Sequence, residues 1–217
     1  MVPVIQISNR HTVRTASDQA FADARTLFAR QGYLRLAAIV EPDFLRVVTD
    51  ALDRSEFYTR IHEGIGSELC ASPSPLTGAL ELAFNDPVLF GFIDELTGCG
   101  AIGCFEGRVY RMVPGAAHYD SWHSDVGEDR LVALSVNLGR EPVDGGLLQI
   151  QRADSPALMA EVENRTPGDA VLFRIDPAFR HRVGPVLGAR TRTAYAGWFR
   201  ARPDYQTLLK ERLGEGI

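Results

Sequence analysis

The sequence predicts an α+β fold in which helices of the first half pack on a mainly β core formed by the second half. Two observations carry this prediction. Apolar residues recur at helical spacing before about residue 100, and short apolar or alternating runs separated by Gly, Pro and Asp follow it. With 217 residues, 45% hydrophobic and 24% charged, the composition is that of one globular domain. We therefore expect a single domain over 1–217, with a helical layer over 1–100, a β core over 103–200 and a C-terminal tail or helix over 201–217.

The first helix is expected over residues 16–31. Thr15 followed by Asp18 resembles a capping signal. The apolar residues between Asp18 and Gly32 fall at helical spacing, and Gly32 supplies a C-terminal stop. A short alternating run over 33–36 comes directly after it.

Two further helices are predicted by proline at the first helical position. Pro42 opens one of them, and Asp86 with Pro87 opens the other, which continues through an apolar run and ends before Gly98. Residues 62–78 lie between these helices and are rich in Gly, Ser and Pro, so we expect a long loop there.

Six strands are expected in the second half, because short apolar runs recur there between turn residues. They span 104–113, 130–138, 147–151, 170–173, 181–186 and 193–199. Several short strands at this spacing predict a β-sandwich or a barrel.

The charge and the cysteines exclude several classes of protein. Lys and Arg number 23 against 28 Asp and Glu, a net charge of −5 with no basic run, which disfavours a nucleic-acid partner. The three cysteines, Cys70, Cys99 and Cys104, suit neither a disulfide framework nor a thiolate zinc site, so we expect a reducing compartment. No signal-peptide pattern and no run of about 18 apolar residues occurs. These patterns predict a cytoplasmic protein without a membrane segment.

Metal chemistry is suggested by His123 and Asp125, which are two residues apart and can turn both side chains to one ion. Taken alone, this pair can arise by chance. His181, 56 residues after Asp125, completes a set of two histidines and one carboxylate. Such a set suits ferrous iron with three coordination positions left open, and it would also suit a hydrolytic zinc ion with a bound water.

An arginine about ten residues past the second histidine discriminates between these metals. Arg190 and Arg192 both follow His181. A guanidinium that points inward there would pair with the far carboxylate of a dicarboxylate cosubstrate, which iron needs and a zinc hydrolase does not.

Four segments in a fixed order around these residues carry a resemblance to a known family. They are Val-Pro-Gly at 113–115, Gly-Gly-Leu-Leu at 145–148, Pro-Gly-Asp-Ala-Val-Leu-Phe at 167–173, and His-Arg-Val at 181–183 with Trp-Phe at 198–199. In this order they resemble the iron(II)/2-oxoglutarate-dependent dioxygenases, in particular the prolyl-hydroxylase-like branch. The resemblance covers 103–200 and implies a double-stranded β-helix, a jelly-roll barrel braced by N-terminal helices.

The resemblance also implies ligands and an activity. His123, Asp125 and His181 would bind Fe(II), and the cosubstrate 2-oxoglutarate would chelate the iron while its C5 carboxylate pairs with an arginine. O₂ would take the last position. The implied reaction hydroxylates an unactivated C–H bond of a small molecule, an amino acid or a peptidyl, for instance prolyl, substrate, and releases succinate and CO₂.

Which arginine would bind the cosubstrate depends on where the count begins. Counting forward from His181 favours Arg190, whereas counting back from Trp198 favours Arg192, and both lie on one face of the expected strand. We favour Arg192, because strand pairing is better kept than the length of a turn. Asn137 stands where some relatives place a hydroxyl-bearing residue, so its amide is expected to donate to the same carboxylate.

Some alternatives stay open at this stage. Arg108 and Tyr110 share one face of the first long strand, which is either exposed to solvent or a wall of the substrate site. The whole chain could also be a catalytically silent jelly-roll protein that binds a ligand, or a zinc-dependent hydrolase built on the same three ligands.

Overall fold

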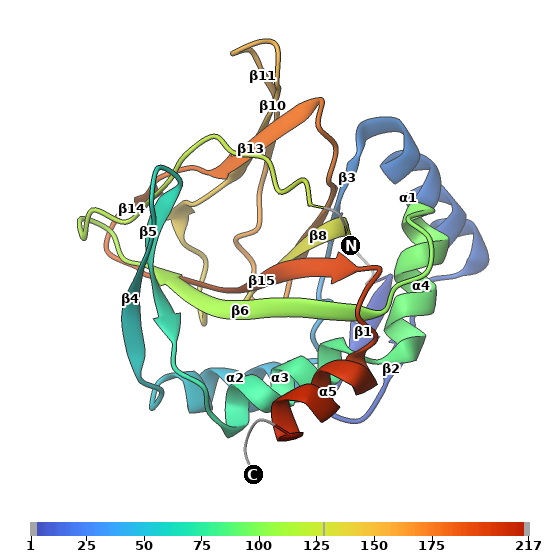
Figure 1. Cartoon of the computed structure of the whole chain (residues 1–217). Coiled ribbons are helices and arrows are strands. Elements are labelled where there is room, and N and C mark those ends of the chain that lie inside the picture. The colour runs from blue at the N-terminus through green and yellow to red at the C-terminus, as the bar shows by residue number, and fades with distance from the viewer. Residues whose placement is uncertain (1–3, 128, 215–217) are drawn as a thin grey trace.

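The computed structural model describes residues 4–127 and 129–214 and is built around one curled sheet (Figure 1). The strands of this main sheet are β3 (Tyr33–Leu36), β4 (Phe57–His62), β5 (Gly66–Ala71), β6 (Cys104–Met112), β7 (Tyr119–Asp120), β8 (Arg130–Asn137), β12 (Ala170–Arg174) and β15 (Arg192–Arg200). Their order is β3-β12-β8-β15-β6-β5-β4, with β7 beside β5. The long strand β15 lies at the centre and pairs antiparallel with β6 and β8 over most of its length.

A smaller sheet faces the concave side of the main sheet. It contains β10 (Leu148–Arg152), β11 (Leu158–Val162) and β13 (Phe179–Val183), all antiparallel, with β10 in the middle. Two short pairs complete the strands: β1 (Ile5–Ile7) with β2 (Thr12–Arg14), and β9 (Asp144–Gly145) with β14 (Val186–Leu187). Two facing antiparallel sheets of this kind form a jelly-roll barrel, which confirms the predicted fold class.

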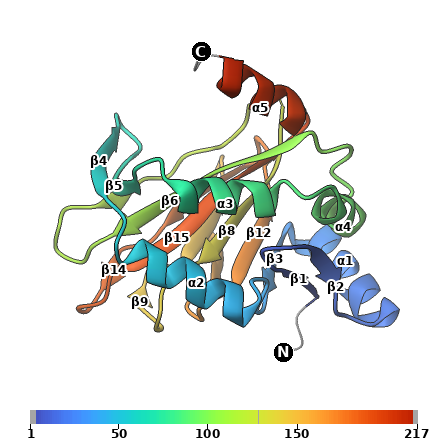
Figure 2. The same cartoon turned by 90° about the horizontal axis from the view of Figure 1, so that it is seen from below.

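Helices cover the convex face of the main sheet, as Figure 2 shows for α2 and α3. The helices are α1 (Asp18–Gln31), α2 (Pro42–Leu52), α3 (Pro75–Phe84), α4 (Pro87–Thr97) and α5 (Tyr205–Gly214). Aromatic rings join the two layers: Phe84 of α3 lies 5.0 Å from Tyr195 and 5.6 Å from Phe105, between ring centroids. Because these rings are almost fully buried, their burial supplies much of the hydrophobic stabilisation between helices and sheet.

Several element bounds differ from the sequence expectations. The N-cap of α1 is Ser17, whose hydroxyl accepts from the backbone N–H of Ala20, so Thr15 is not the cap. The starts at Pro42 and Pro87 are confirmed. The C-terminal segment forms α5 from Tyr205 to Gly214, and the last part of the expected tail, 215–217, lies outside the described residues.

The expected loop over 62–78 was wrong. It contains β5 and the start of α3, which is capped by a reciprocal pair of hydrogen bonds between Ser74 and Thr77. The cap was readable, since Ser before Pro75 is a helix start signal. The strand was not, because β4 and β5 show no clean alternation of buried and exposed residues. The first hundred residues therefore extend both edges of the main sheet as well as supplying helices.

Among the described residues, no single helix is long and apolar enough to cross a membrane. α3 and α4 pass a test of length and composition only when taken together, as a pair bent by 52°.

Candidate metal centre

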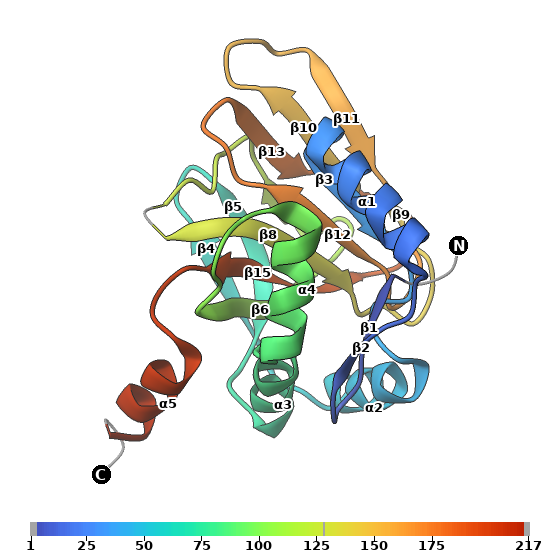
Figure 3. The same ribbon diagram turned by 90° about the vertical axis from the view of Figure 1, so that its right-hand side faces the viewer.

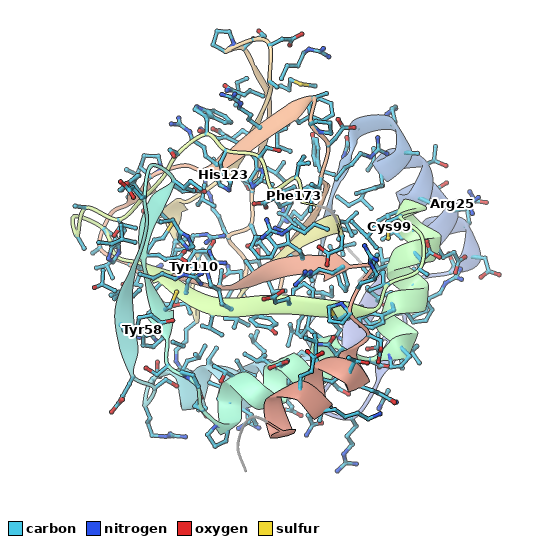
Figure 4. The ribbon with its side chains drawn as sticks, viewed as in Figure 1. Arg25, Tyr58, Cys99, Tyr110, His123 and Phe173 are labelled. Atoms are coloured by element: carbon cyan, nitrogen blue, oxygen red, sulfur yellow. The ribbon has the colours of Figure 1, made fainter. Side chains whose placement is uncertain are left out.

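His123, Asp125 and His181 meet at the open end of the barrel. One ligand atom from each lies within 4.8 Å of the others, and no other such group of three occurs within residues 4–127 and 129–214. The Nε2 atoms of His123 and His181 lie 3.6 Å and 3.3 Å from the Asp125 carboxylate. All three side chains are at most 19% exposed. Figure 4 labels His123 in the space between β13 and β15.

The backbone brings the two histidines together across 58 residues of sequence. His123 N–H donates to the His181 carbonyl at 3.1 Å and His181 N–H donates to the His123 carbonyl at 2.9 Å. This isolated antiparallel bridge places the two imidazoles side by side, with ring centroids 4.4 Å apart. This pair of backbone hydrogen bonds ties the segment that holds His123 to β13.

A hydrogen bond at Nδ1 sets the tautomer of His123. Nδ1 lies 2.7 Å from the Ser121 carbonyl, and because a carbonyl only accepts, Nδ1 carries the proton. In the neutral imidazole this leaves the lone pair on Nε2, the nitrogen that faces Asp125 and His181. A metal-binding histidine is oriented in the same way in many proteins.

The Asp125 carboxylate is anionic and held in place. Trp198 Nε1 donates to its Oδ2 at 2.7 Å, and the Arg130 guanidinium stacks 3.7 Å above the Trp198 ring. Burial by itself would raise the pKa of Asp125, but hydrogen bonds from His181 and Trp198 and the charge of the histidines outweigh it and lower the pKa to about 2. Two imidazole nitrogens and one oriented carboxylate form a donor set that fits ferrous iron or another divalent ion.

Arg192 lies in the same cavity as these three residues. The cavity has a volume of about 260 Å³ and is lined by His123, Asp125, His181 and Arg192 together with side chains of β5, β6 and β8. The Arg192 residue is 4% exposed and has no carboxylate partner among the described residues. Its guanidinium donates to the Tyr110 hydroxyl and to Ser135 Oγ. A buried cation without an anion is costly, so the pocket is suited to an anionic ligand.

Gly146 leaves the space that Arg192 needs. A Cβ atom at this position would lie 2.7 Å from Arg192 Cδ, and the φ angle of +62° also favours glycine. Arg190, by contrast, is exposed on the outside and pairs with Glu141 at 2.9 Å. The structure therefore places Arg192, and not Arg190, in the barrel.

Asn137 does not face Arg192. Its amide nitrogen donates to the Asn164 carbonyl and its oxygen accepts from Gly139 N–H, so the side chain braces the turn after β8. Tyr110 and Ser135 stand beside the guanidinium instead, and sequence reasoning missed both in this role. No local pattern brings Tyr110 to Arg192; the register of β15 against β6, in which Tyr110 lies opposite Ala194, does so.

Comparison with known proteins agrees with this geometry. Residues 107–200 match the family model described as the 2OG-Fe(II) oxygenase superfamily. No curated protein matches the chain. Two solved structures similar to it are bacterial: a prolyl-4-hydroxylase from Pseudomonas putida (24% identity, TM-score 0.64, 84% of this chain and 100% of that chain covered) and a 2OG-Fe(II) oxygenase family oxidoreductase from Burkholderia pseudomallei (16%, 0.62, 92% and 97%).

A third similar structure is a prolyl hydroxylase from Trichoplax adhaerens in complex with a hypoxia inducible factor peptide fragment (16% identity, TM-score 0.59, 86% of this chain and 94% of that chain covered). At these identities the structures support the jelly-roll fold alone. The family match is to the 2OG-Fe(II) oxygenase superfamily and includes the His-Asp-His group and Arg192, so the chain is similar to this superfamily over the part that holds the candidate site.

Proposed function

We propose that the chain is an Fe(II)- and 2-oxoglutarate-dependent dioxygenase that hydroxylates an unactivated C–H bond of a small molecule, an amino acid or a peptidyl residue such as proline. The buried Arg192 carries this proposal, because its guanidinium lacks a carboxylate partner among the described residues and shares a cavity with His123, Asp125 and His181. A hydrolytic metal site would have no use for such a cation. An anionic cosubstrate that also reaches the metal uses both features.

When bound, iron and 2-oxoglutarate supply the oxidation: one O₂ converts 2-oxoglutarate and the substrate C–H bond into succinate, CO₂ and the hydroxylated product. In the proposed roles, His123, Asp125 and His181 hold the iron. Arg192 receives the C5 carboxylate of 2-oxoglutarate in a charge-assisted hydrogen bond.

Other side chains position these groups. Tyr110 and Ser135 accept hydrogen bonds from Arg192 and fix the direction of its guanidinium. The Trp198 N–H and the Ser121 carbonyl orient Asp125 and His123. Because the donors and acceptors are already in place, little reorganisation is needed when the ligands bind.

The decisive experiment measures succinate formation from 2-oxoglutarate by the purified protein under air with Fe(II), alongside O₂ uptake. We expect both to depend on iron and to stop when Zn(II) replaces it. A protein that takes up zinc and hydrolyses esters or amides without O₂ uptake would be a zinc hydrolase. Iron-loaded protein that neither binds nor turns over 2-oxoglutarate would contradict the proposal.

The substrate is a matter for screening. Peptides belong in the screen because the Trichoplax relative was solved with a peptide, and small carboxylic acids and amino acids belong there because the cavity is small. The net charge of −5 makes a nucleic-acid substrate unexpected. The cytoplasmic location stays a prediction, which the three free thiols of Cys70, Cys99 and Cys104 support.

A further inference from the structure

A second cavity reaches the metal centre from the outer side of the barrel. Its volume is about 250 Å³, and it lies between the end of α1, β3, the β10–β11 hairpin and the turn from β12 to β13. Figure 3 shows α1 and this hairpin on the same side of the molecule. Both cavities are lined by Ser124, Asp125, Phe173 and His181, so the two meet at the candidate metal ligands.

Three arginines line the outer cavity. Arg30 comes from the last turn of α1, Arg174 from the end of β12 and Arg180 from β13. All three are exposed, and in the described part of the chain no carboxylate lies within 4.0 Å of their guanidinium groups. The Arg174 guanidinium lies 5.6 Å from the centroid of the Phe28 ring and has no acidic partner. Three cations thus line one small space, and none of them is paired with a carboxylate among the described residues.

Several other exposed arginines differ in this respect, although Arg10, Arg25, Arg54 and Arg202 are also exposed and have no carboxylate partner among the described residues. Arg46, Arg152 and Arg190 are each paired with a neighbouring carboxylate, at 3.3 Å, 2.9 Å and 2.9 Å. Within the outer cavity, Asp176 is the one acidic side chain besides Asp125, and its Oδ1 accepts from the Ala178 backbone N–H. A chain with a net charge of −5 therefore gathers unpaired positive charge here, and a concave site focuses that field.

Apolar side chains also line the outer cavity. They are Ile150, Met159, Phe173, Ile175 and Phe179. Phe173 packs against His181 with ring centroids 4.7 Å apart, and Figure 4 labels it beside His123. Met159 is 53% exposed although it belongs to a cavity wall, so an apolar ligand would remove its surface from water.

We propose that this outer cavity binds the substrate, and that the substrate is a small apolar molecule carrying one anionic group, a carboxylate or a phosphate. The anionic group meets Arg30, Arg174 and Arg180, and the apolar body lies along Met159 and Phe173 toward Asp125 and His181. This assignment rests on the proposed dioxygenase function, since it uses the metal centre as the place of reaction. It assigns the cavity of about 260 Å³ that holds Arg192 to the cosubstrate, and the outer cavity to the substrate.

Binding is measured by calorimetry on the protein loaded with Fe(II) and 2-oxoglutarate under argon, so that no turnover occurs. The probes are 3-phenylpropionate and phenyl phosphate, which separate the two kinds of anion, and the neutral 3-phenylpropionamide. We expect saturable binding of at least one anion, weakened by salt, and binding of the amide that is about tenfold weaker or absent.

The variant carries Arg30→Gln, Arg174→Gln and Arg180→Gln together. Its affinity for the anionic probe should fall about tenfold or more, since charge-assisted hydrogen bonds are lost. The matched control carries Arg46→Gln, Arg152→Gln and Arg190→Gln, which changes the net charge equally and should leave probe binding unchanged. Thermal unfolding of both variants checks that the exposed substitutions preserve the fold.

Two results overturn the proposal: equal probe affinity in the wild type and the Arg30/Arg174/Arg180 variant, or no saturable binding of either anion to the wild type. Titrations of Fe(II) and 2-oxoglutarate keep this separate from the proposed function, because both should be unchanged in the two variants. Failure of the wild type to bind iron and 2-oxoglutarate would instead refute the dioxygenase function, and with it the substrate role of the cavity.

Discussion

Asp125 is the anionic member of the candidate metal group, and its carboxylate touches both histidines and Trp198. With three protein ligands available, loss of one should sharply weaken metal binding. We predict that Asp125→Ala loses Fe(II) binding and succinate formation, measured by iron titration and 2-oxoglutarate turnover. Ser124→Ala, which changes only the residue between the ligands, should keep both. Wild-type iron affinity in Asp125→Ala would remove Asp125 from the proposed ligand set.

Arg192 and Arg190 differ in burial, and this difference predicts different mutant kinetics. If Arg192 is removed, the C5 carboxylate of the bound cosubstrate stays buried without a partner, which weakens binding by about 3–5 kcal/mol. Loss of an exposed ion pair such as that of Arg190 costs little. We predict that Arg192→Ala raises the apparent KM for 2-oxoglutarate by about 100-fold or more, and that Arg190→Ala changes it by about twofold at most. If Arg190→Ala proves the damaging change, the cosubstrate does not bind beside Tyr110 and Ser135.

Trp198 acts on the metal centre through Asp125. Trp198→Phe removes the N–H that donates to Oδ2 but keeps a ring for Arg130 to stack on. Because loss of a hydrogen bond to a metal ligand typically weakens metal affinity about 10–100-fold, we predict a drop in Fe(II) affinity within this range. Trp122→Phe is the control, since the Trp122 ring lies 4.7 Å from the Arg182 guanidinium and, among the described residues, Trp198 and not Trp122 donates to Asp125. Unchanged iron affinity in Trp198→Phe would show that the hydrogen bond does not position the carboxylate.

Among the elements, β15 contributes two residues of the candidate site. It holds Arg192 at its first residue and Trp198 near its end, and it pairs with β6 and β8 on its two sides. Gly197 lets β6 approach, because a Cβ atom there would lie 2.0 Å from the Glu106 carbonyl oxygen. The position of Trp198 thus depends on a close backbone contact next to it.

Gly197→Ala should therefore destabilise the protein through overpacking in the central strand pair. We predict a loss of about 3 kcal/mol in unfolding free energy and a Tm lower by roughly 6–12 °C. Gly91→Ala is the matched control, because Gly91 is exposed in α4 with open space around its Cβ position. That change should raise stability by about 0.5–1 kcal/mol through helix propensity. Equal melting temperatures for the two variants would contradict the contact between β15 and β6.

At the scale of the whole molecule, the metal ligands lie at one place where the two sheets meet; an apolar cluster that includes Phe173 of β12 and Leu148 of β10 also joins the sheets. His123 precedes β8 of the main sheet, while His181 lies in β13 of the smaller sheet, and Asp125 contacts both. A ligand that bridges them should stabilise the entire domain, since it binds the folded state alone.

We accordingly predict that Fe(II) and 2-oxoglutarate, each at about 100 times its Kd, raise the unfolding free energy by at least about 2.7 kcal/mol and the Tm by roughly 5–10 °C. Differential scanning calorimetry under argon measures the shift, and a chelator should reverse it. Asp125→Ala should show no shift. A wild-type Tm indifferent to iron would mean that no metal joins the two sheets.

The sequence by itself determined the helices opened by Pro42 and Pro87, the long strands β6, β8 and β15, and the grouping of His123, Asp125 and His181. These follow from local signals: proline at the first helical position, apolar runs between turns, and a motif order that resembles one family. Local signals do not depend on which segments become neighbours.

Only the tertiary structure decided the placements that depend on long-range pairing. Arg190 and Arg192 share a strand face in the sequence, and the register of β15 against β6 is what brings Arg192 to Tyr110 while Arg190 pairs with Glu141. Asn137 lies two residues from Ser135, yet its side-chain amide forms hydrogen bonds with backbone groups instead of with Arg192 or a ligand beside it. The outer cavity joins Arg30 to Arg174 and Arg180 across about 150 residues, a proximity that no local pattern encodes, because it arises from the packing of α1 and β3 against β12 and the smaller sheet.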